Sequence, residues 1–306
     1  AFAEYWQPAG VASIEAWMHQ RRLAETLARK FGDHPGVNYL RGMIDLRLGD
    51  GGAALGFFEQ AHSADEDFLP VREELGMLYL DAAKVDEALD VMPSDVPVYG
   101  AVEYILEQAA VDRTLADRSD PCRCGSEKKY RSCCARRLRL SPNDEIALID
   151  IRLKNYLSQP PWSLQMDRLA DIVSTESGLM SFPEALADPF VQDVLAVEAG
   201  GASSYLAARR GLVSDSDGEL LATFVAQSRE AFDVVGVDTA TLSLAHPDSG
   251  TSLTIPRPEG PVERGDAVLI RTIDRNDGPV AIGPVVGIPA SHVSLLRITL
   301  AARPTA

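Results

Sequence analysis

All four cysteines of the 306-residue chain lie within one stretch of thirteen residues, at Cys122, Cys124, Cys133 and Cys134. The spacing C-x-C-x8-C-C brings together enough thiolates to close a tetrahedral zinc shell, which leaves no open position for a substrate. Gly125 follows the second cysteine and suits the tight turn of a chelating loop, because glycine accepts positive φ at little cost. The segment therefore predicts a structural zinc ion and not a catalytic one.

The sequence leaves alternatives to a zinc site open for the four cysteines. Cys133 and Cys134 are neighbours and can hardly pair with each other, but each could form a disulfide with Cys122 or Cys124. The first residues of the chain do not read as a secretion signal, so nothing favours the oxidising compartment in which disulfides persist. Iron–sulfur clusters usually have other cysteine spacings, and four unrelated buried thiols would not cluster in this way. Zinc is the favoured interpretation.

The cysteine segment is also strongly basic, although the whole chain carries a net charge of −16. Residues 122–139 hold one acid, Glu127, and seven bases: Arg123, Lys128, Lys129, Arg131, Arg136, Arg137 and Arg139. This segment therefore carries +6, and the other 288 residues together carry −22. The acidic body repels the phosphates of nucleic acids, whereas the basic segment attracts an acidic partner.

The residues from Cys122 to Cys134 resemble the SEC-C motif, whose pattern is C-x-C-G-S-G-K-K-[YF]-K-x-C-[CH]. They match it at both cysteine pairs, at Gly125-Ser126, at Lys128-Lys129-Tyr130 and at the basic Arg131. They depart from it at Glu127, where the family has glycine, which bears on the backbone of the loop. The motif ends the preprotein translocase ATPase SecA and recurs in many otherwise unrelated bacterial proteins.

In SecA this motif binds zinc and docks on the export chaperone SecB and on the ribosome. The resemblance implies that a structural Zn²⁺ ion is held by Cys122, Cys124, Cys133 and Cys134. It also implies that a partner is contacted by Lys128, Lys129, Arg131, Arg136 and Arg137. The motif accounts for the segment 119–140 alone, and nothing of the SecA motor domains is visible elsewhere, so translocase activity is not implied.

A period of 34 residues precedes the cysteine segment. Small and apolar residues recur at this distance in three pairs: Gly42 and Gly76, Ala54 and Ala88, Leu55 and Leu89. These offsets resemble the tetratricopeptide repeat (TPR), in which small residues let two antiparallel helices approach closely. The inter-helix turns are expected at Asp50-Gly51-Gly52 and Ala82-Ala83-Lys84. Met92-Pro93 stands where the second copy should carry an aromatic residue. The segment 1–118 is therefore predicted as a TPR-like helical repeat domain, with a generic helical bundle as the alternative.

Further helices are expected on either side of the repeats and in the middle of the chain. One runs from Ile14 to Lys30, and another, from Val98 to Ala116, closes the stack. The segment 141–231 is predicted as a helical region, with a loop at Gly200-Gly201. Its expected helices are Glu145–Leu157, Leu164–Ser174, Phe182–Ala187, Val191–Glu198 and Glu219–Phe232.

The segment 232–306 is predicted as a small β domain, because short β-branched runs alternate with turn residues. The expected strands are Asp233–Val237, Thr241–Ala245, Ser252–Ile255, Ala267–Ile273, Val280–Ile288 and Val293–Leu300. Six short strands in this length are typical of a small barrel, OB-like or SH3-like. Such barrels can bind oligonucleotides, but this one lacks the aromatic residues between Lys and Arg on which bases would stack.

No catalytic motif is recognisable in the sequence. The five histidines stand singly, at His19, His34, His62, His246 and His292. None has a second histidine or a carboxylate at the spacing of a catalytic metal site. Asp215-Ser216-Asp217-Gly218-Glu219 is similar to part of a calcium loop but lacks the distal bidentate Glu, so a solvated turn is favoured. No catalytic residues are assigned, and we expect that the chain is not an enzyme.

Together these features predict a mainly α protein with TPR-like repeats, a SEC-C zinc finger, a helical middle region and a small barrel-like β end. No run of eighteen apolar residues could span a membrane, and we expect a cytoplasmic, bacterial protein. The expected function is that of an adaptor whose basic finger docks on the ribosome or on export and chaperone machinery. Two alternatives stay open: an RNA-binding factor that uses the finger and the β domain, and a zinc site that only staples two helical domains together.

Overall fold

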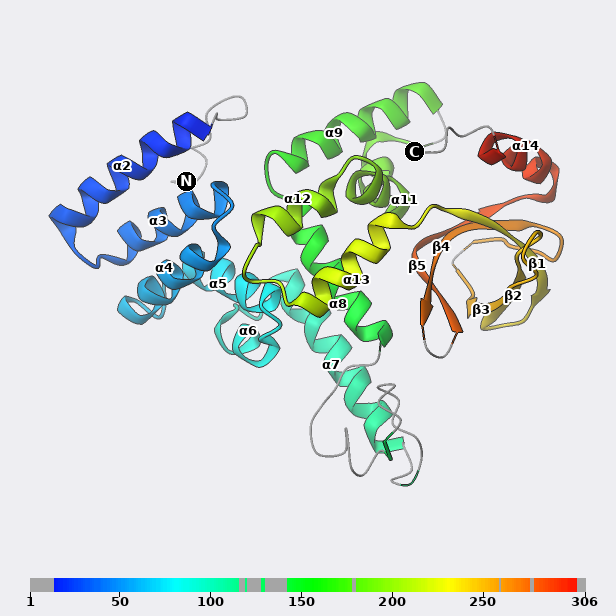
Figure 1. Ribbon diagram of the computed structural model, residues 1–306, viewed down its shortest axis with the longest axis horizontal. Helices are drawn as coiled ribbons and strands as arrows, with labels where there is room; N and C mark the ends of the chain where they lie inside the picture. Colours follow the sequence, from blue (N-terminus) through cyan, green and yellow to red (C-terminus); the bar gives the residue numbers. More distant parts are fainter. Residues whose placement is uncertain are drawn as a thin grey trace. The chain divides into compact units, whose positions relative to one another are not determined.

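Helices make up most of the computed structural model, and an antiparallel sheet of five strands lies toward the C-terminal end of the chain (Figure 1). The structure describes residues 14–115, 119, 128–129, 142–177, 180–258, 260–275 and 278–301. The mainly α fold class with a small C-terminal β domain is therefore confirmed.

The chain folds into two compact units, each made of two segments. Unit 1 comprises Ala1–Gln165 and Gly200–Leu221, and unit 2 comprises Met166–Ala199 and Ala222–Ala306. The stretch 141–231, expected to be one helical region, thus contributes to both units.

Unit 1 is helical. Its helices are α2 (Ile14–Phe31), α3 (Pro35–Arg47), α4 (Gly51–Ala64), α5 (Leu69–Asp81), α6 (Val85–Val91), α7 (Pro97–Leu115), α8 (Pro142–Leu157) and α12 (Gly201–Ala208). Two further helices, α9 (Trp162–Ile172) and α13 (Asp215–Ala226), begin in unit 1 and end in unit 2. The expected helices before and after the repeats correspond to α2 and α7.

Two helical hairpins of unit 1, α3–α4 and α5–α6, repeat with an offset of 34 residues, since α3 begins at Pro35 and α5 at Leu69. The turns share this offset. Gly49 and Ala83 both have positive φ, at 79° and 57°. The Gly49 N–H donates to the Leu46 carbonyl oxygen at 3.2 Å, and the Ala83 N–H donates to the Leu80 carbonyl oxygen at 2.9 Å. The 34-residue period of the sequence thus corresponds to a backbone geometry that is repeated in the turns of the two hairpins.

Small residues let the two helices of each hairpin approach closely. A Cβ atom on Gly42 would lie 2.7 Å from Cε1 of Phe58, whose side chain is fully buried. A Cβ atom on Gly76 would lie 2.9 Å from Cβ of Met92, which stands 34 residues after Phe58. Met92 therefore fills the place of the expected aromatic residue in the second hairpin, because an unbranched side chain can follow an irregular gap.

Buried apolar residues of the hairpins form two neighbouring clusters in unit 1. The first consists of Leu46, Ala54, Phe58, Ala61, Val71, Leu75, Leu78 and Val91. The second consists of Met77, Leu80, Ala88, Met92, Val102, Ile105 and Leu148, and it ties α7 and α8 to the second hairpin.

The predicted turn at Asp50-Gly51-Gly52 is displaced, because both glycines already belong to α4. The Asp50 carboxylate accepts a hydrogen bond from the Ala53 N–H at 3.0 Å and so caps the helix. Gly51 is needed for close packing, since a Cβ atom there would lie 2.7 Å from Cδ1 of Leu212. The predicted loop at Gly200-Gly201 is likewise wrong in part, because Gly200 is the left-handed N-cap residue of α12 and Gly201 begins the helix.

Unit 2 combines short helices with the sheet. Its first segment holds the end of α9, the π-helical turn η2 (Val173–Ser177), α10 (Phe182–Ala187), α11 (Pro189–Asp193) and the π-helical turn η3 (Val194–Glu198). Its second segment holds β1 (Glu230–Val237), β2 (Thr241–Ala245), β3 (Ser252–Pro256), β4 (Ala267–Arg275), β5 (Gly278–Ile288) and α14 (Ala290–Ala301).

The five strands are ordered β3-β2-β1-β4-β5, and every neighbouring pair is antiparallel. The sheet curls into a half-barrel. Its register is interrupted between Val234 and Gly236 in β1 and between Leu269 and Arg271 in β4, where irregularities of this kind bend a strand. The concave core consists of Phe232, Val234, Leu242, Leu244, Leu253, Ile255, Val262, Val268 and Ile270.

Two predictions about the β domain are wrong. The expected sixth strand, Val293–Leu300, is part of helix α14, and the expected helix Glu219–Phe232 ends at Ala226, so that β1 begins at Glu230. The apolar residues of α14 fit both periods, but only the helical period leaves Leu295 and Ile298 on the outer side, with 64% and 68% of their surface exposed.

Candidate functional sites

The predicted zinc ligands Cys122, Cys124, Cys133 and Cys134 lie outside the described residues, as do Arg131, Arg136 and Arg137. The structure does describe the helices on either side. Helix α7 ends at Leu115, helix α8 begins at Pro142, and the two helices pack against each other (Figure 1). The cysteine segment therefore joins two packed helices of unit 1, and its metal site stays a prediction.

Two of the predicted partner contacts, Lys128 and Lys129, are described, and both are exposed. Both side chains therefore lie at the surface of the described part of the chain. Within the parts of the chain that the structure describes, no group of three or more His, Cys, Asp or Glu side chains could hold a metal ion. This finding does not bear on the four cysteines.

Two of the histidines have roles in local structure. Nδ1 of His34 accepts a hydrogen bond from the Gly36 N–H at 3.1 Å and caps α3. Nδ1 of His246 accepts from the Ser249 N–H at 3.1 Å and orders the loop between β2 and β3. The stretch similar to a calcium loop is not a turn, because Asp215 to Glu219 form the start of α13. Asp217 is held there by Nη1 of Arg152 at 2.8 Å.

A buried polar network links α5 to α12 in unit 1. The carboxylate of Asp81 accepts hydrogen bonds from the Tyr205 hydroxyl at 2.7 Å and from Nε of Arg209 at 2.8 Å. Burial raises the pKa of Asp81 against the opposing charge of Arg209. Burial, followed by the charge of Asp81, also raises the pKa of Tyr205, so the hydroxyl stays a hydrogen-bond donor. Each buried group has a partner, which is the arrangement of a structural network.

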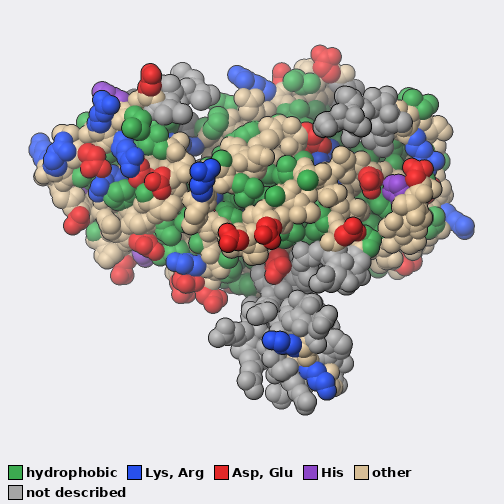
Figure 2. All heavy atoms as spheres, viewed as in Figure 1, with side chains coloured by type: hydrophobic (Ala, Val, Ile, Leu, Met, Phe, Trp, Pro, Cys, Tyr) green, Lys and Arg blue, Asp and Glu red, His purple; other side chains and the backbone are tan. Residues whose placement is uncertain are grey.

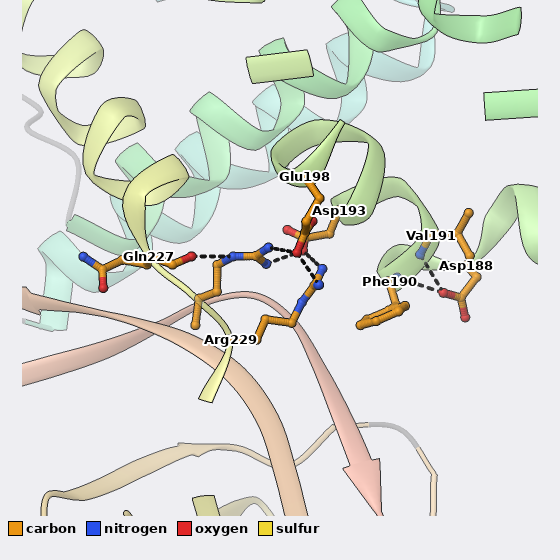
Figure 3. A network of polar contacts seen from close by, with 8 residues as sticks. Asp188, Phe190, Val191, Asp193, Glu198, Gln227 and Arg229 are labelled. Atoms are coloured by element: carbon orange, nitrogen blue, oxygen red, sulfur yellow. Dashed lines mark hydrogen bonds and ion pairs between the residues drawn. The ribbon is translucent and has the colours of Figure 1, made fainter. Parts of the chain in front are cut away.

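A second network lies in unit 2 and is shown in Figure 3. Asp193 Oδ2 accepts hydrogen bonds from Nη2 of Arg229 and Nη1 of Arg271. Glu198 Oε1 accepts from Nη1 of Arg229 and from Nη2 of Arg271, at 2.6 Å in both cases. Nε of Arg271 donates to the carbonyl oxygen of Gln227 at 3.0 Å. Each guanidinium therefore bridges both carboxylates.

The four charged side chains of this network differ in burial. Arg271, Arg229 and Asp193 are 2%, 4% and 6% exposed, whereas Glu198 is 42% exposed. Burial lowers the pKa of Arg229, and the neighbouring charge of Arg271 acts in the same direction. The ring of Phe190 lies 4.3 Å from Cζ of Arg229 and shields its guanidinium on one side.

Four structural elements bring these charges together. Arg229 directly precedes β1 and Arg271 belongs to β4, and these strands pair at Glu230 and Ile270. Asp193 ends α11, and Glu198 ends the π-helical turn η3. A π-helical turn places one more residue in the turn than an α-helix does, and such turns are frequent at functional sites.

Sequence reasoning missed this network because its members lie 31 to 78 residues apart in pairs and follow no short spacing. It also missed a second basic surface, on α2, which carries Arg21, Arg22, Arg29 and Lys30 against two acids. Figure 2 shows Lys and Arg side chains gathered over this end of unit 1. A count of charges along the helix would have found it.

No protein-family model, no curated protein and no solved structure matches this chain. Among the helices that the structure describes, none is both long and apolar enough to cross a lipid bilayer. Conclusions about function therefore depend on the residues and geometry of the chain itself.

Proposed function

We propose that the chain is a zinc-dependent docking adaptor, bacterial and cytoplasmic, and not an enzyme. Its single structural Zn²⁺ ion is coordinated by Cys122, Cys124, Cys133 and Cys134. Its docking surface consists of Lys128, Lys129, Arg131, Arg136 and Arg137. The observation that carries the proposal is that every cysteine of the chain and a local charge of +6 occur in one eighteen-residue segment. The resemblance of this segment to the SEC-C motif implies the same four cysteine ligands.

The described flanks support a docking role. The segment connects the end of α7 to the start of α8, and both lysines described within it are exposed. The 34-residue hairpins next to it have the close helix packing of TPR-like repeats, which often serve as interaction scaffolds. In this proposal the helical unit holds the finger and the finger makes the contact.

The partner is an acidic surface, either the ribosome or an export chaperone. The charge of the finger is opposite in sign to the −22 of the remaining chain, so an acidic partner is attracted by the finger and repelled by the body. Charged contacts of this kind guide the encounter and weaken with salt, because the Debye length falls to about 8 Å at physiological ionic strength.

A binding experiment with purified components tests the proposal. The full chain is mixed with purified ribosomes or with purified SecB, at ~0.1 M and ~0.5 M salt. The test variant is Lys128→Glu/Lys129→Glu/Arg131→Glu. The control variant, Arg168→Glu/Arg210→Glu/Arg264→Glu, has the same change in net charge at three other exposed arginines.

We expect the wild type and the control variant to bind one of the two partners at low salt, and the finger variant to bind at least about tenfold more weakly. Loss of ribosome binding after the RNA is digested, with no binding to SecB, favours the RNA-binding alternative. Binding by the finger variant equal to that of the wild type means that the finger is an internal staple, and this result contradicts the docking role.

A further inference from the structure

The two arginines of the unit 2 network are neutralised unequally. Arg229 and Arg271 together bring two positive charges into the interior, and the buried Asp193 supplies one negative charge. The second negative charge comes from Glu198, whose side chain is largely accessible to water. A buried charge without a counter-ion is strongly unfavourable. Unit 2 therefore requires an anion at the position of the Glu198 carboxylate.

The contacts at this position converge on one oxygen atom. Glu198 Oε1 receives both N–H groups, and no hydrogen bond of its Oε2 is seen in the described part of the chain. If Glu198 swings out, Asp193 Oδ2 still accepts from both guanidiniums, and the Gln227 carbonyl oxygen still accepts from Nε of Arg271 on the opposite side of that group (Figure 3). The guanidiniums of Arg229 and Arg271 are thus held in place without Glu198.

A second observation concerns another donor of Arg229. Nε of Arg229 is fully buried and has no hydrogen-bond partner among the described residues, although a guanidinium normally uses its donors when buried. The carboxylate of Glu198 uses only one of its oxygens and leaves this donor unsatisfied. An anion that is not tethered to η3 can take a different position between the two arginines.

We propose that Arg229 and Arg271 form a carboxylate-binding site in unit 2 and that Glu198 is its displaceable internal occupant. The ligand class follows from charge: with Asp193 present, one further negative charge neutralises the pair. A carboxylate supplies one charge, whereas a phosphate carries about 1.5 to 2 negative charges at neutral pH and would leave an excess. The planar fork of a guanidinium also matches a carboxylate.

Glu198 competes with any external carboxylate. The apparent dissociation constant of a ligand is its intrinsic value divided by the fraction of molecules whose site is open. If Glu198 is displaced in about 1–10% of molecules, the wild type binds about 10–100-fold more weakly than a chain without this side chain. A ligand that binds releases Glu198 at the end of η3, so binding is coupled to this turn.

Heat unfolding of the full chain in acetate tests the site. The test variant is Glu198→Ala, measured with sodium acetate, sodium phosphate or sodium chloride at equal ionic strength. The matched control is Asp233→Ala, which removes the carboxylate of another arginine pair in unit 2, Arg297 with Asp233, whose partners are both substantially exposed. A solvated arginine needs no replacement anion.

We expect Glu198→Ala to unfold at a lower temperature than the wild type in chloride and to regain about 3 °C or more in acetate. The wild type and Asp233→Ala should shift by less than about 1 °C. The NMR signal of the Arg229 Nε–H should move on addition of acetate to Glu198→Ala, which locates the binding.

Equal acetate responses of Glu198→Ala and Asp233→Ala, or an unmoved Arg229 signal, overturn the site. A larger stabilisation by phosphate than by acetate overturns the assignment to carboxylates. Should Glu198→Ala not fold in chloride, its folding in acetate but not in chloride provides the same test, because the added anion replaces the missing charge, and failure to fold in acetate overturns the site.

Discussion

The close contact between Gly42 and Phe58 gives the sharpest test of the hairpin packing. In Gly42→Ala the new Cβ atom would lie 2.7, 2.8 and 3.0 Å from three carbon atoms of the Phe58 ring. The ring is fully buried, so the strain cannot be relieved by moving into solvent. Overpacking of this kind costs about 1–3 kcal/mol. Gly→Ala in a helix interior also gains about 1 kcal/mol of helix propensity, which partly offsets the strain.

Gly56→Ala is the matched control, because Gly56 lies in the middle of α4 and a Cβ atom there meets nothing within 4 Å. Both variants gain the same propensity, so the difference in their free energies of unfolding isolates the clash, at about 1–3 kcal/mol. Urea unfolding followed by circular dichroism measures it. Adding Phe58→Leu should remove most of the penalty of Gly42→Ala, since the smaller side chain leaves room. Equal stabilities of Gly42→Ala and Gly56→Ala would refute the packing argument.

Three further predictions concern charges. Asp193→Asn leaves two buried guanidiniums without their buried carboxylate, and urea unfolding should show a loss of about 3–5 kcal/mol; a loss below about 1 kcal/mol contradicts the network. Arg297→Ala removes an exposed ion pair with Asp233 and should change the free energy of unfolding by less than about 1 kcal/mol by the same measurement; a larger loss means that α14 depends on this pair. Hydrogen bonds from the Ala240 N–H and from the Thr241 hydroxyl and N–H lower the pKa of Asp238 below 3.8 in the folded protein. The stability that this carboxylate contributes is therefore fully present above pH 3.8 and is lost as the pH falls through the lower pKa of the folded state. An NMR titration of the Asp238 carboxyl carbon should have its midpoint below 3.8, and a midpoint at or above this value contradicts the hydrogen bonds.

The sequence predicted the helical part of the fold well where local signals and close packing agree. Gly32 and Pro35 mark the end of α2 and the start of α3. Glycine recurs at Gly42 and Gly76 because a larger side chain at either position would obstruct the close contact between two helices. The 34-residue offset is therefore visible in both the residues and the backbone. Met92 differs from the expected aromatic residue, because the contact with Gly76 requires a side chain of suitable shape and not an aromatic ring.

The errors arose where local pattern was ambiguous or where tertiary contacts decide. The apolar residues of α14 fit a strand and a helix equally well, and the chain after Pro289 becomes helical. Gly201 starts a helix although paired glycines favour a loop. The network of Asp193, Arg229 and Arg271 is assembled by strand pairing and by the turn η3, and neither has a signature in the sequence. The cysteine segment lies outside the described residues, so its zinc site stays a prediction from residue type and spacing.

The most direct test of the proposed function is a measurement of the metal on freshly purified, full-length chain. Elemental analysis combined with X-ray absorption at the zinc edge should find one zinc ion per chain, surrounded by four sulfur atoms at about 2.3 Å. Absence of stoichiometric zinc, nitrogen or oxygen ligands in place of sulfur, or a mass that shows the cysteines joined as disulfides would contradict the finger and the docking function that depends on it.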